Sequence, residues 1–169
     1  MADVVVRPYR PSDHGAGRKL WTELADQHRQ LYEGSGSGRG DPADAFEEYL
    51  TRLDLSGVWV AEHPDDGVVG LVGLIMSGRA GRVEPVVVTR HRRGRGIGRT
   101  LLGRVAEEAR RRGLARLTVT PESRNVGALR ALHGAGYDVL SAVELTLDLR
   151  RRNGNWRTDT ELHGLQFRS

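Results

Sequence analysis

The chain has 169 residues, a length that fits one domain with a substantial core. It contains no cysteine, which excludes disulfides, thiolate metal ligands and a cysteine nucleophile, and we expect no resident metal. The net charge is +4, and Lys19 is the sole lysine, so the basic residues are almost all arginine. We find no apolar signal region and no run of roughly 20 apolar residues, so we expect a cytoplasmic protein without a membrane partner.

The first third of the chain predicts one strand and two helices. Val4–Arg7 is β-branched and is followed by prolines, which indicates a short strand. Apolar residues at helical spacing predict a helix over about Asp13–Tyr32. Glu33–Asp41 is rich in glycine and serine and is expected to be a mobile loop. Pro42 suits the first position of a second helix, whose apolar face would extend to Leu53.

The middle of the chain predicts three strands joined by tight turns. Val58–Glu62 and Val68–Met76 flank His-Pro-Asp-Asp-Gly, which is typical of a hairpin. Arg82–Thr89 follows as the next strand. Pro85 lies inside it, and because proline cannot donate to a strand ladder we expect a bulge or an unpaired position there.

The remaining elements alternate between helix and strand. Helices are expected over 96–113 and 125–133, and strands over Leu117–Thr120, Tyr137–Leu140 and Val143–Leu149. The unit 82–120 implies a parallel pair of strands. The fold class is therefore α/β (α+β), with a mixed, mostly antiparallel central sheet of about seven strands and about four helices on both faces. Residues 1–149 would form one domain and 150–169 a polar tail.

The stretch Val86–Arg99, VVVTRHRRGRGIGR, predicts a strand, a glycine-rich basic turn and the start of a helix. The first N–H groups of a helix have no partner within it, and the helix dipole adds positive charge there. Glycines let a ligand approach the backbone closely. No Ser, Thr, Asp or Asn caps the helix at 93–98, so a bound phosphate or pyrophosphate could take that place.

Two motifs in this chain resemble the GCN5-related N-acetyltransferase (GNAT) superfamily. Arg93-Gly94-Arg95-Gly96-Ile97-Gly98 matches the family's Q/R-x-x-G-x-G/A signature between a strand and a helix. The segment from Asn125 through Gly136-Tyr137 resembles the later N-x-x-A…G-F/Y motif. The resemblance covers about residues 3–149 and implies acetyl-CoA as acetyl donor. It assigns cofactor binding to Val86, Val87, Val88, Arg93, Gly94, Arg95, Gly96, Ile97, Gly98, Arg99 and Asn125.

The chain departs from the family at two catalytic positions. Leu132 stands where many members have a tyrosine, and Thr120 stands where some have a glutamate. For the base, Glu84 is the first candidate, although it could equally be a surface carboxylate paired with Arg82. His133 is a candidate acid or base, the alternative being a solvated histidine at a helix end.

The acceptor is expected to be an amine, on a small molecule or a protein. His28 and Tyr32 lie beside the glycine-rich loop and are candidates for acceptor binding, or are ordinary surface residues. Trp156 and Phe167 in the tail could anchor a homodimer.

Other functions remain as alternatives. A Rossmann site would need glycine where Arg99 or Leu101 stands, and a P-loop would need Gly-Lys-Ser/Thr. The turn is basic enough for a nucleic-acid-binding module, but it lacks interleaved aromatic residues, so nucleic acid is disfavoured. A non-catalytic acetyl-CoA-binding protein also fits. The favoured reading is an N-acetyltransferase that transfers acetyl to a primary amine directly, in a ternary complex.

Overall fold

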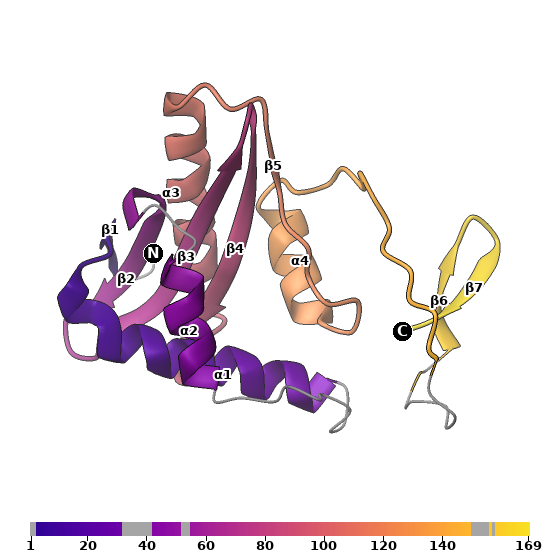
Figure 1. Cartoon of the computed structure of the whole chain (residues 1–169), viewed down its shortest axis with the longest axis horizontal. Helices are drawn as coiled ribbons and strands as arrows, with labels where there is room; N and C mark the ends of the chain where they lie inside the picture. The colour runs from indigo at the N-terminus through magenta and orange to yellow at the C-terminus, as the bar shows by residue number, and fades with distance from the viewer. Residues whose placement is uncertain (1–2, 32–41, 52–54, 150–155, 157) are drawn as a thin grey trace. The chain divides into compact units, whose positions relative to one another are not determined.

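A computed structural model describes residues 3–31, 42–51, 55–149, 156 and 158–169 of the chain (Figure 1). Its internal contacts divide the chain into two compact units. Unit 1 consists of Met1–Asp26 and Arg39–Thr120, and unit 2 of Gln27–Gly38 and Pro121–Ser169. In the part that the structure describes, no helix is both long and apolar enough to pass through a bilayer.

Unit 1 contains a sheet whose described strands run in the order β1-β2-β3-β4-β5. They are β1 (Val5–Pro8), β2 (Val58–His63), β3 (Gly67–Ser77), β4 (Ala80–Val88) and β5 (Arg116–Thr118). The first four pair antiparallel through hairpins, and β5 pairs parallel to β4 after a helical crossover. This confirms the expected mixed, mostly antiparallel sheet and its parallel pair.

The two parallel strands diverge soon after they meet. β5 pairs with β4 only between Ala80–Arg82 and Arg116–Thr118. β4 continues to Val88, so among the described strands its last six residues have a neighbour on the β3 side alone. The backbone groups of Val86–Val88 that face β5 therefore lie at an open edge inside the sheet.

The bulge expected at Pro85 is present. Val72 pairs with Val86 and Leu74 with Val83, which leaves Gly73 opposite the two residues Glu84 and Pro85. From a helix above the sheet, the Tyr49 hydroxyl donates a hydrogen bond of 2.5 Å to the Glu84 carbonyl oxygen. A Cβ on Gly73 would overlap both of these oxygen atoms. The bulge is thus fixed by the proline, by Tyr49 and by the absence of a side chain at Gly73.

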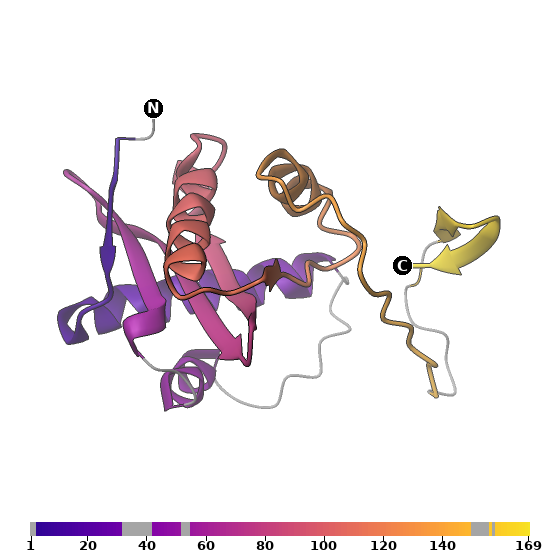
Figure 2. The same ribbon diagram turned by 90° about the horizontal axis from the view of Figure 1, so that it is seen from above.

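Helices cover both faces of the sheet (Figure 2). α1 (His14–Leu31) and α2 (Pro42–Thr51) lie on one face, and α3 (Ile97–Arg111) lies on the other. Alternating strand residues serve the two faces, as period-two side-chain geometry requires. The core on the α1 and α2 side is made of Tyr9, Leu20, Phe46, Tyr49, Val58, Val60, Leu71 and Val87. On the other side Ile97, Leu101, Leu102 and Val105 of α3 are buried.

Unit 2 differs from the prediction in its strands. α4 (Val126–Gly134) forms as expected. Tyr137–Leu140 and Val143–Leu149 were expected to extend the central sheet, and this is wrong: neither forms a strand. Instead the tail forms a separate hairpin of β6 (Thr158–Leu162) and β7 (Leu165–Arg168). The central sheet consequently has five described strands rather than about seven. Alternation of apolar residues favours a strand, but a strand forms only where its backbone finds hydrogen-bonding partners. Leu147 and Leu149 are more than four-fifths exposed, so the apolar side of this segment is not packed against a core.

Tyr32, Leu53 and the glycine-rich loop Glu33–Asp41 lie outside the described residues. The predictions made for them, including acceptor binding by Tyr32, are therefore not assessed by the fold.

Candidate functional site: a glycine turn at an open strand edge

The predicted anion-binding turn forms at the carboxyl end of β4. The chain leaves the strand through a single 3-10 turn, Arg90–Arg92, and enters α3 at Ile97. Gly94 and Gly96 have φ values of 74° and 82°, which only glycine adopts without strain. The turn therefore depends on glycine at two of the three alternating positions.

The N-terminus of α3 has no side-chain cap. Gly96 is the N-cap residue and makes no side-chain hydrogen bond, and the first backbone bond of the helix runs from the Thr100 N–H to the Gly96 carbonyl oxygen at 3.0 Å. The N–H groups of Ile97, Gly98 and Arg99 precede that bond. Such groups, together with the helix dipole, bind phosphate oxygens well.

The uncapped helix end adjoins the open edge of β4. A Cβ built on Gly98 would lie 3.9 Å from a methyl group of Val88. Strand edge and helix N-terminus thus meet at one place in unit 1. An extended ligand arm could pair with the strand while an attached anionic group binds at the helix.

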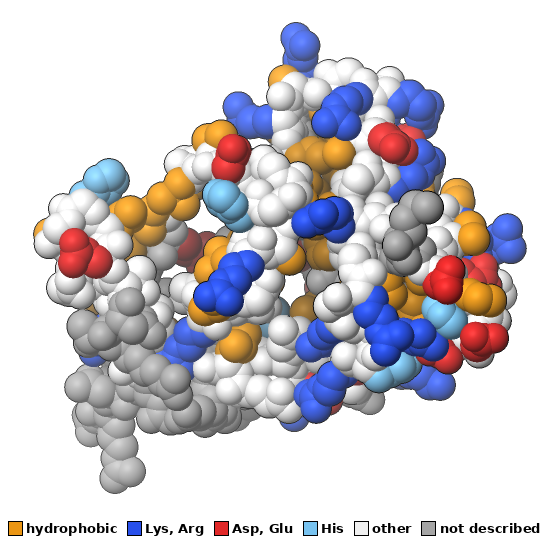
Figure 3. All heavy atoms as spheres, turned by 180° about the vertical axis from the view of Figure 1, so that it is seen from behind, with side chains coloured by type: hydrophobic (Ala, Val, Ile, Leu, Met, Phe, Trp, Pro, Cys, Tyr) orange, Lys and Arg blue, Asp and Glu red, His pale blue; other side chains and the backbone are white. Residues whose placement is uncertain are grey.

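The arginines around the turn fall into two groups. Arg92 is held by Asp66 of the β2–β3 turn at 2.6 Å, and this guanidinium lowers the pKa of the Asp66 carboxyl below its ordinary value. Arg93 donates to the Val88 carbonyl oxygen at 2.8 Å. The side chains of Arg95 and Arg99 are exposed, and within the described chain neither guanidinium makes a hydrogen bond or ion pair. Figure 3, which views the chain from behind relative to Figure 1, shows several Lys and Arg side chains on that face.

A carboxylate from α1 contacts the start of the turn, and sequence reasoning missed it. Glu23 accepts a hydrogen bond of 2.7 Å from the Thr89 hydroxyl and another of 2.8 Å from the Arg90 N–H. The residues lie more than sixty positions apart, and nothing around Glu23 in the sequence marks this role. A polar Thr89 directly after the apolar run Val86–Val88 is the one local signal that could have indicated a side-chain contact there.

The candidate base Glu84 lies on the bulge. Its carboxylate is half exposed and forms an ion pair with Arg82 at 3.0 Å, as the surface alternative anticipated. Its main-chain carbonyl is held by Tyr49. The side chain is therefore accessible at the strand whose edge is open, and an accessible carboxylate can accept a proton from an incoming group.

The remaining candidate residues belong to unit 2. Asn125 caps α4, its side-chain oxygen accepting from the Ala128 N–H at 3.0 Å. His133 is exposed in the last turn of that helix, and Leu132 beside it is buried. His28 is exposed near the end of α1. The structure brings Val86–Val88 and the turn together in unit 1, and it describes these three polar residues separately from them.

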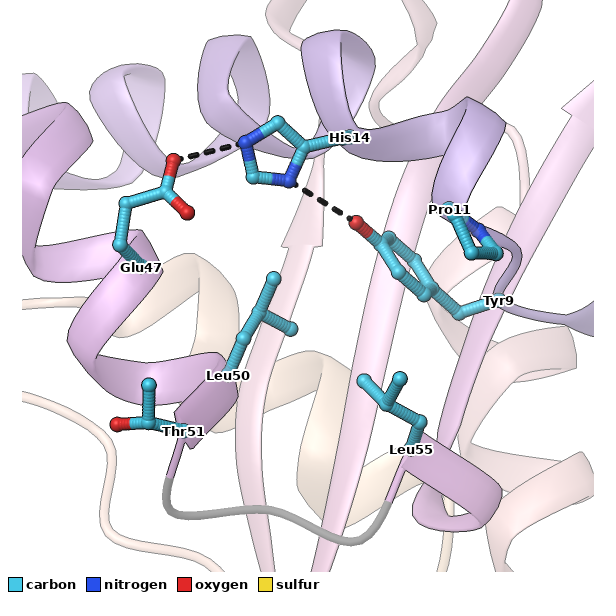
Figure 4. A pocket seen from close by; sticks show the side chains of 7 residues that line it. All are labelled: Tyr9, Pro11, His14, Glu47, Leu50, Thr51 and Leu55. Atoms are coloured by element: carbon cyan, nitrogen blue, oxygen red, sulfur yellow. Dashed lines mark hydrogen bonds and ion pairs between the residues drawn. The ribbon is translucent and has the colours of Figure 1, made fainter.

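Unit 1 also contains a pocket of about 380 Å³ between α1 and α2, shown in Figure 4. His14 lies at its wall between Glu47, at 2.7 Å, and the Tyr9 hydroxyl, at 3.4 Å. Leu50 and Leu55 line its apolar side. None of the predicted site residues lines this pocket. Among the described residues no group of three or more histidine, cysteine, aspartate or glutamate side chains is placed to hold a metal ion.

Solved structures share this fold. An acetyltransferase of the GNAT family from Staphylococcus aureus superimposes with a TM-score of 0.64 at 17% identity, covering 86% of this chain and 94% of that one. The yncA protein of Salmonella typhimurium, with its cofactor acetyl-CoA, has a TM-score of 0.62 at 24% identity, covering 79% of each chain. A Mycobacterium tuberculosis protein in complex with CoA has a TM-score of 0.53 at 28% identity, covering 77% and 70%.

No curated protein sequence matches the chain. The model of the acetyltransferase (GNAT) family matches residues 18–137, which include the sheet from β2 onward, the glycine turn, α3 and α4. Since this match covers well over half of the sequence, and the fold agrees with it, the chain belongs to the acetyltransferase (GNAT) family.

Proposed function

We propose that the protein is an N-acetyltransferase that transfers the acetyl group of acetyl-CoA to a primary amine by direct attack in a ternary complex. One observation carries the proposal: the open edge of β4 leads directly into the uncapped N-terminus of α3. This arrangement suits a long ligand with a hydrogen-bonding arm and a pyrophosphate, which is the chemistry of coenzyme A. Relatives of the same fold are solved with CoA or acetyl-CoA.

Different residues of unit 1 would bind different parts of the cofactor. The backbone groups of Val86–Val88 on the side away from β3 would pair with the pantetheine arm. The amides of residues 94–99 would hold the pyrophosphate, and Arg95 and Arg99 would add positive charge beside it. Arg93, which donates to the Val88 carbonyl, would release that oxygen to the arm. Asn125 remains a proposed cofactor contact through its side-chain amide.

Bound acetyl-CoA would supply the acetyl thioester, and the protein would supply a base. We assign this role to Glu84, whose exposed carboxylate can take a proton from an ammonium group directly or through one water. His133 stays a proposed acid or base, and His28 and Tyr32 stay proposed acceptor contacts.

Two observations favour a second candidate, a non-catalytic protein that binds acetyl-CoA. Buried Leu132 occupies the position of the family's tyrosine, and Glu84 already has a cationic partner. This candidate predicts cofactor binding without acetyl transfer to any amine.

Titration calorimetry with acetyl-CoA tests the binding site. We expect binding at low salt that weakens as salt rises, because the ligand is a polyanion. Gly98→Glu should abolish binding, since it places a carboxylate among the amides of the first turn. Gly103→Glu adds the same charge to the exposed part of α3, where a side chain meets no atom within 4 Å, and should bind normally. Equal binding by both variants would place the anion site elsewhere.

An amine panel then separates the two candidates. Release of the CoA thiol can be followed with a thiol reagent, and the chain contributes no background because it has no cysteine. Transfer to at least one amine supports the enzyme. Saturable binding with no transfer across small amines, peptide N-termini and lysine peptides supports the non-catalytic protein. Glu84→Gln should slow transfer most at low pH, and an unchanged pH–rate profile removes Glu84 as the base.

A further inference from the structure

Glu23 places a negative charge near the proposed anion-binding turn, where positive charge would be expected. It is close to the start of the basic turn, and it contacts two consecutive residues there, Thr89 and Arg90. A carboxylate beside an anion site weakens anion binding by repulsion unless it does something else. Both oxygens of this carboxylate are used, one by the hydroxyl and one by the backbone N–H.

Thr89 is a junction of the local hydrogen bonds. It is 7% exposed, its N–H donates to the Val69 carbonyl at 2.9 Å, and its own carbonyl accepts from the Arg92 N–H at 3.0 Å. Its hydroxyl donates to Glu23. The residue thereby connects the last pairing of β4 with the first bend of the turn, and its hydroxyl links both to α1.

The second contact of Glu23 is a helix cap from a distant part of the chain. Thr89 is the N-cap of the 3-10 turn Arg90–Arg92 and makes no capping bond of its own. The Arg90 N–H, at the first position of this turn, donates to the Glu23 carboxylate. A charged acceptor is the strongest partner for such a donor. On the far side of the turn Asp66 holds Arg92, so the bend is fixed at both ends.

We propose that Glu23 is a positioning residue that fixes the start of the turn so that the amides of residues 94–99 point at the pyrophosphate. The inference rests on the proposed function, because it concerns the same cofactor site. It also gives α1 a second task beyond covering the sheet with Leu20 and Leu24. A movement of α1 at Glu23 would be transmitted to the cofactor turn through two hydrogen bonds.

Calorimetry at low salt can compare the affinity of the wild type and of Glu23→Gln for coenzyme A. The proposal is tested by whether the variant binds more weakly or more tightly than the wild type. Simple electrostatics predicts tighter binding when a negative charge near the anion is removed. The positioning role predicts binding that is weaker by about tenfold, because the amide keeps one acceptor and loses the other together with the charge. Tighter or unchanged binding by Glu23→Gln overturns the proposal.

Matched variants separate positioning from a general loss of stability. Thr89→Ser keeps the hydroxyl and should bind like wild type, whereas Thr89→Val should lose affinity as Glu23→Gln does. In the double variant Glu23→Gln/Thr89→Val the loss of affinity should be smaller than the sum of the two single losses, since both changes affect the contact between the Thr89 hydroxyl and Glu23. Glu107→Gln removes an exposed carboxylate from α3, whose nearest partner is Arg104 at 3.7 Å, and should leave affinity unchanged.

Kinetics supply a readout that a purely structural role would not move. For Glu23→Gln we expect the KM for acetyl-CoA to rise with little change in kcat, because the loss is in cofactor binding. A variant that melts earlier yet binds coenzyme A with wild-type affinity well below its melting temperature also contradicts the proposal. If the wild type itself does not bind coenzyme A, the proposed function fails; if it binds and Glu23→Gln binds equally well, only the role of Glu23 fails.

Discussion

Gly73 faces the bulge of β4, and replacing it with alanine tests how that bulge is held. An added Cβ would overlap the Tyr49 hydroxyl and the Glu84 carbonyl oxygen, which are hydrogen-bonded to each other at 2.5 Å. One of these atoms is main chain, so the Tyr49 side chain cannot relieve the clash by itself. Overpacking of a filled core costs about 1–3 kcal/mol. Loss of the hydrogen bond leaves a buried hydroxyl without a partner, which costs about 1–3 kcal/mol more.

We therefore expect Gly73→Ala to lower the free energy of unfolding by about 4 kcal/mol, a large share of the roughly 5–15 kcal/mol that holds a typical domain together. Urea unfolding followed by tryptophan fluorescence measures this, since Trp59 is buried in the adjoining strand. Gly103→Ala is the matched control: it lies in exposed helix with open space around it and should stabilise by about 0.5–1 kcal/mol. A Gly73→Ala protein within about 1 kcal/mol of wild type would refute the described packing of Tyr49 on the bulge.

Three further outcomes are expected. Phe46→Ala empties a fully buried ring position between α1 and α2 and should lower the free energy of unfolding by about 3–5 kcal/mol in the same urea assay; a loss below about 1 kcal/mol would contradict that burial. Hydrogen bonds from Arg111 and Arg112 lower the pKa of Glu108 from 4.5 to about 2. The ionised Glu108 carboxylate therefore stabilises the fold fully above pH 4.5, and this stabilisation is lost as the pH falls towards 2. Glu108→Gln should flatten the pH dependence of the melting temperature across that window, and an unchanged slope counts against the ion pairs. Arg95→Gln should weaken coenzyme A binding and reduce its salt dependence, while affinity and salt dependence like those of the wild type would remove Arg95 from the proposed anion site.

Elements with strong local signals were predictable, because their causes lie within a few residues. The turn at Gly94 and Gly96 needs positive φ, and α3 has an apolar residue at every helical interval on one face. Pro85 cannot donate to a strand, so an irregularity at that position follows from its chemistry alone. The hairpin of β2 and β3 follows in the same way from its Asp-Asp-Gly turn.

Contacts between distant segments were not predictable from spacing. The sequence indicates a bulge at Pro85, but not that Tyr49 donates to the Glu84 carbonyl oxygen, thirty-five positions later in the chain. The alternation at Val143–Leu149 indicated a half-buried strand and misled, because strand formation depends on a partner that alternation does not specify. Glu84 was only partly predictable. The sequence placed it on the signature strand and left two roles open for its carboxylate, and the structure shows the carboxylate paired with Arg82.

The sequence by itself determined the strand, glycine turn and helix that make an anion receptor, because φ preferences, helical periodicity and the missing cap are properties of adjacent residues. The tertiary structure decided that β5 leaves β4 after Arg82, so that the receptor continues into an open strand edge. It also brought Glu23 of α1 to Thr89 and Arg90. Both features depend on how whole helices and strands pack: the divergence of β4 from β5, and the contact between Glu23 and Thr89, sixty-six residues apart. Packing of this kind is determined by residues throughout the chain, so no single stretch of sequence predicts it.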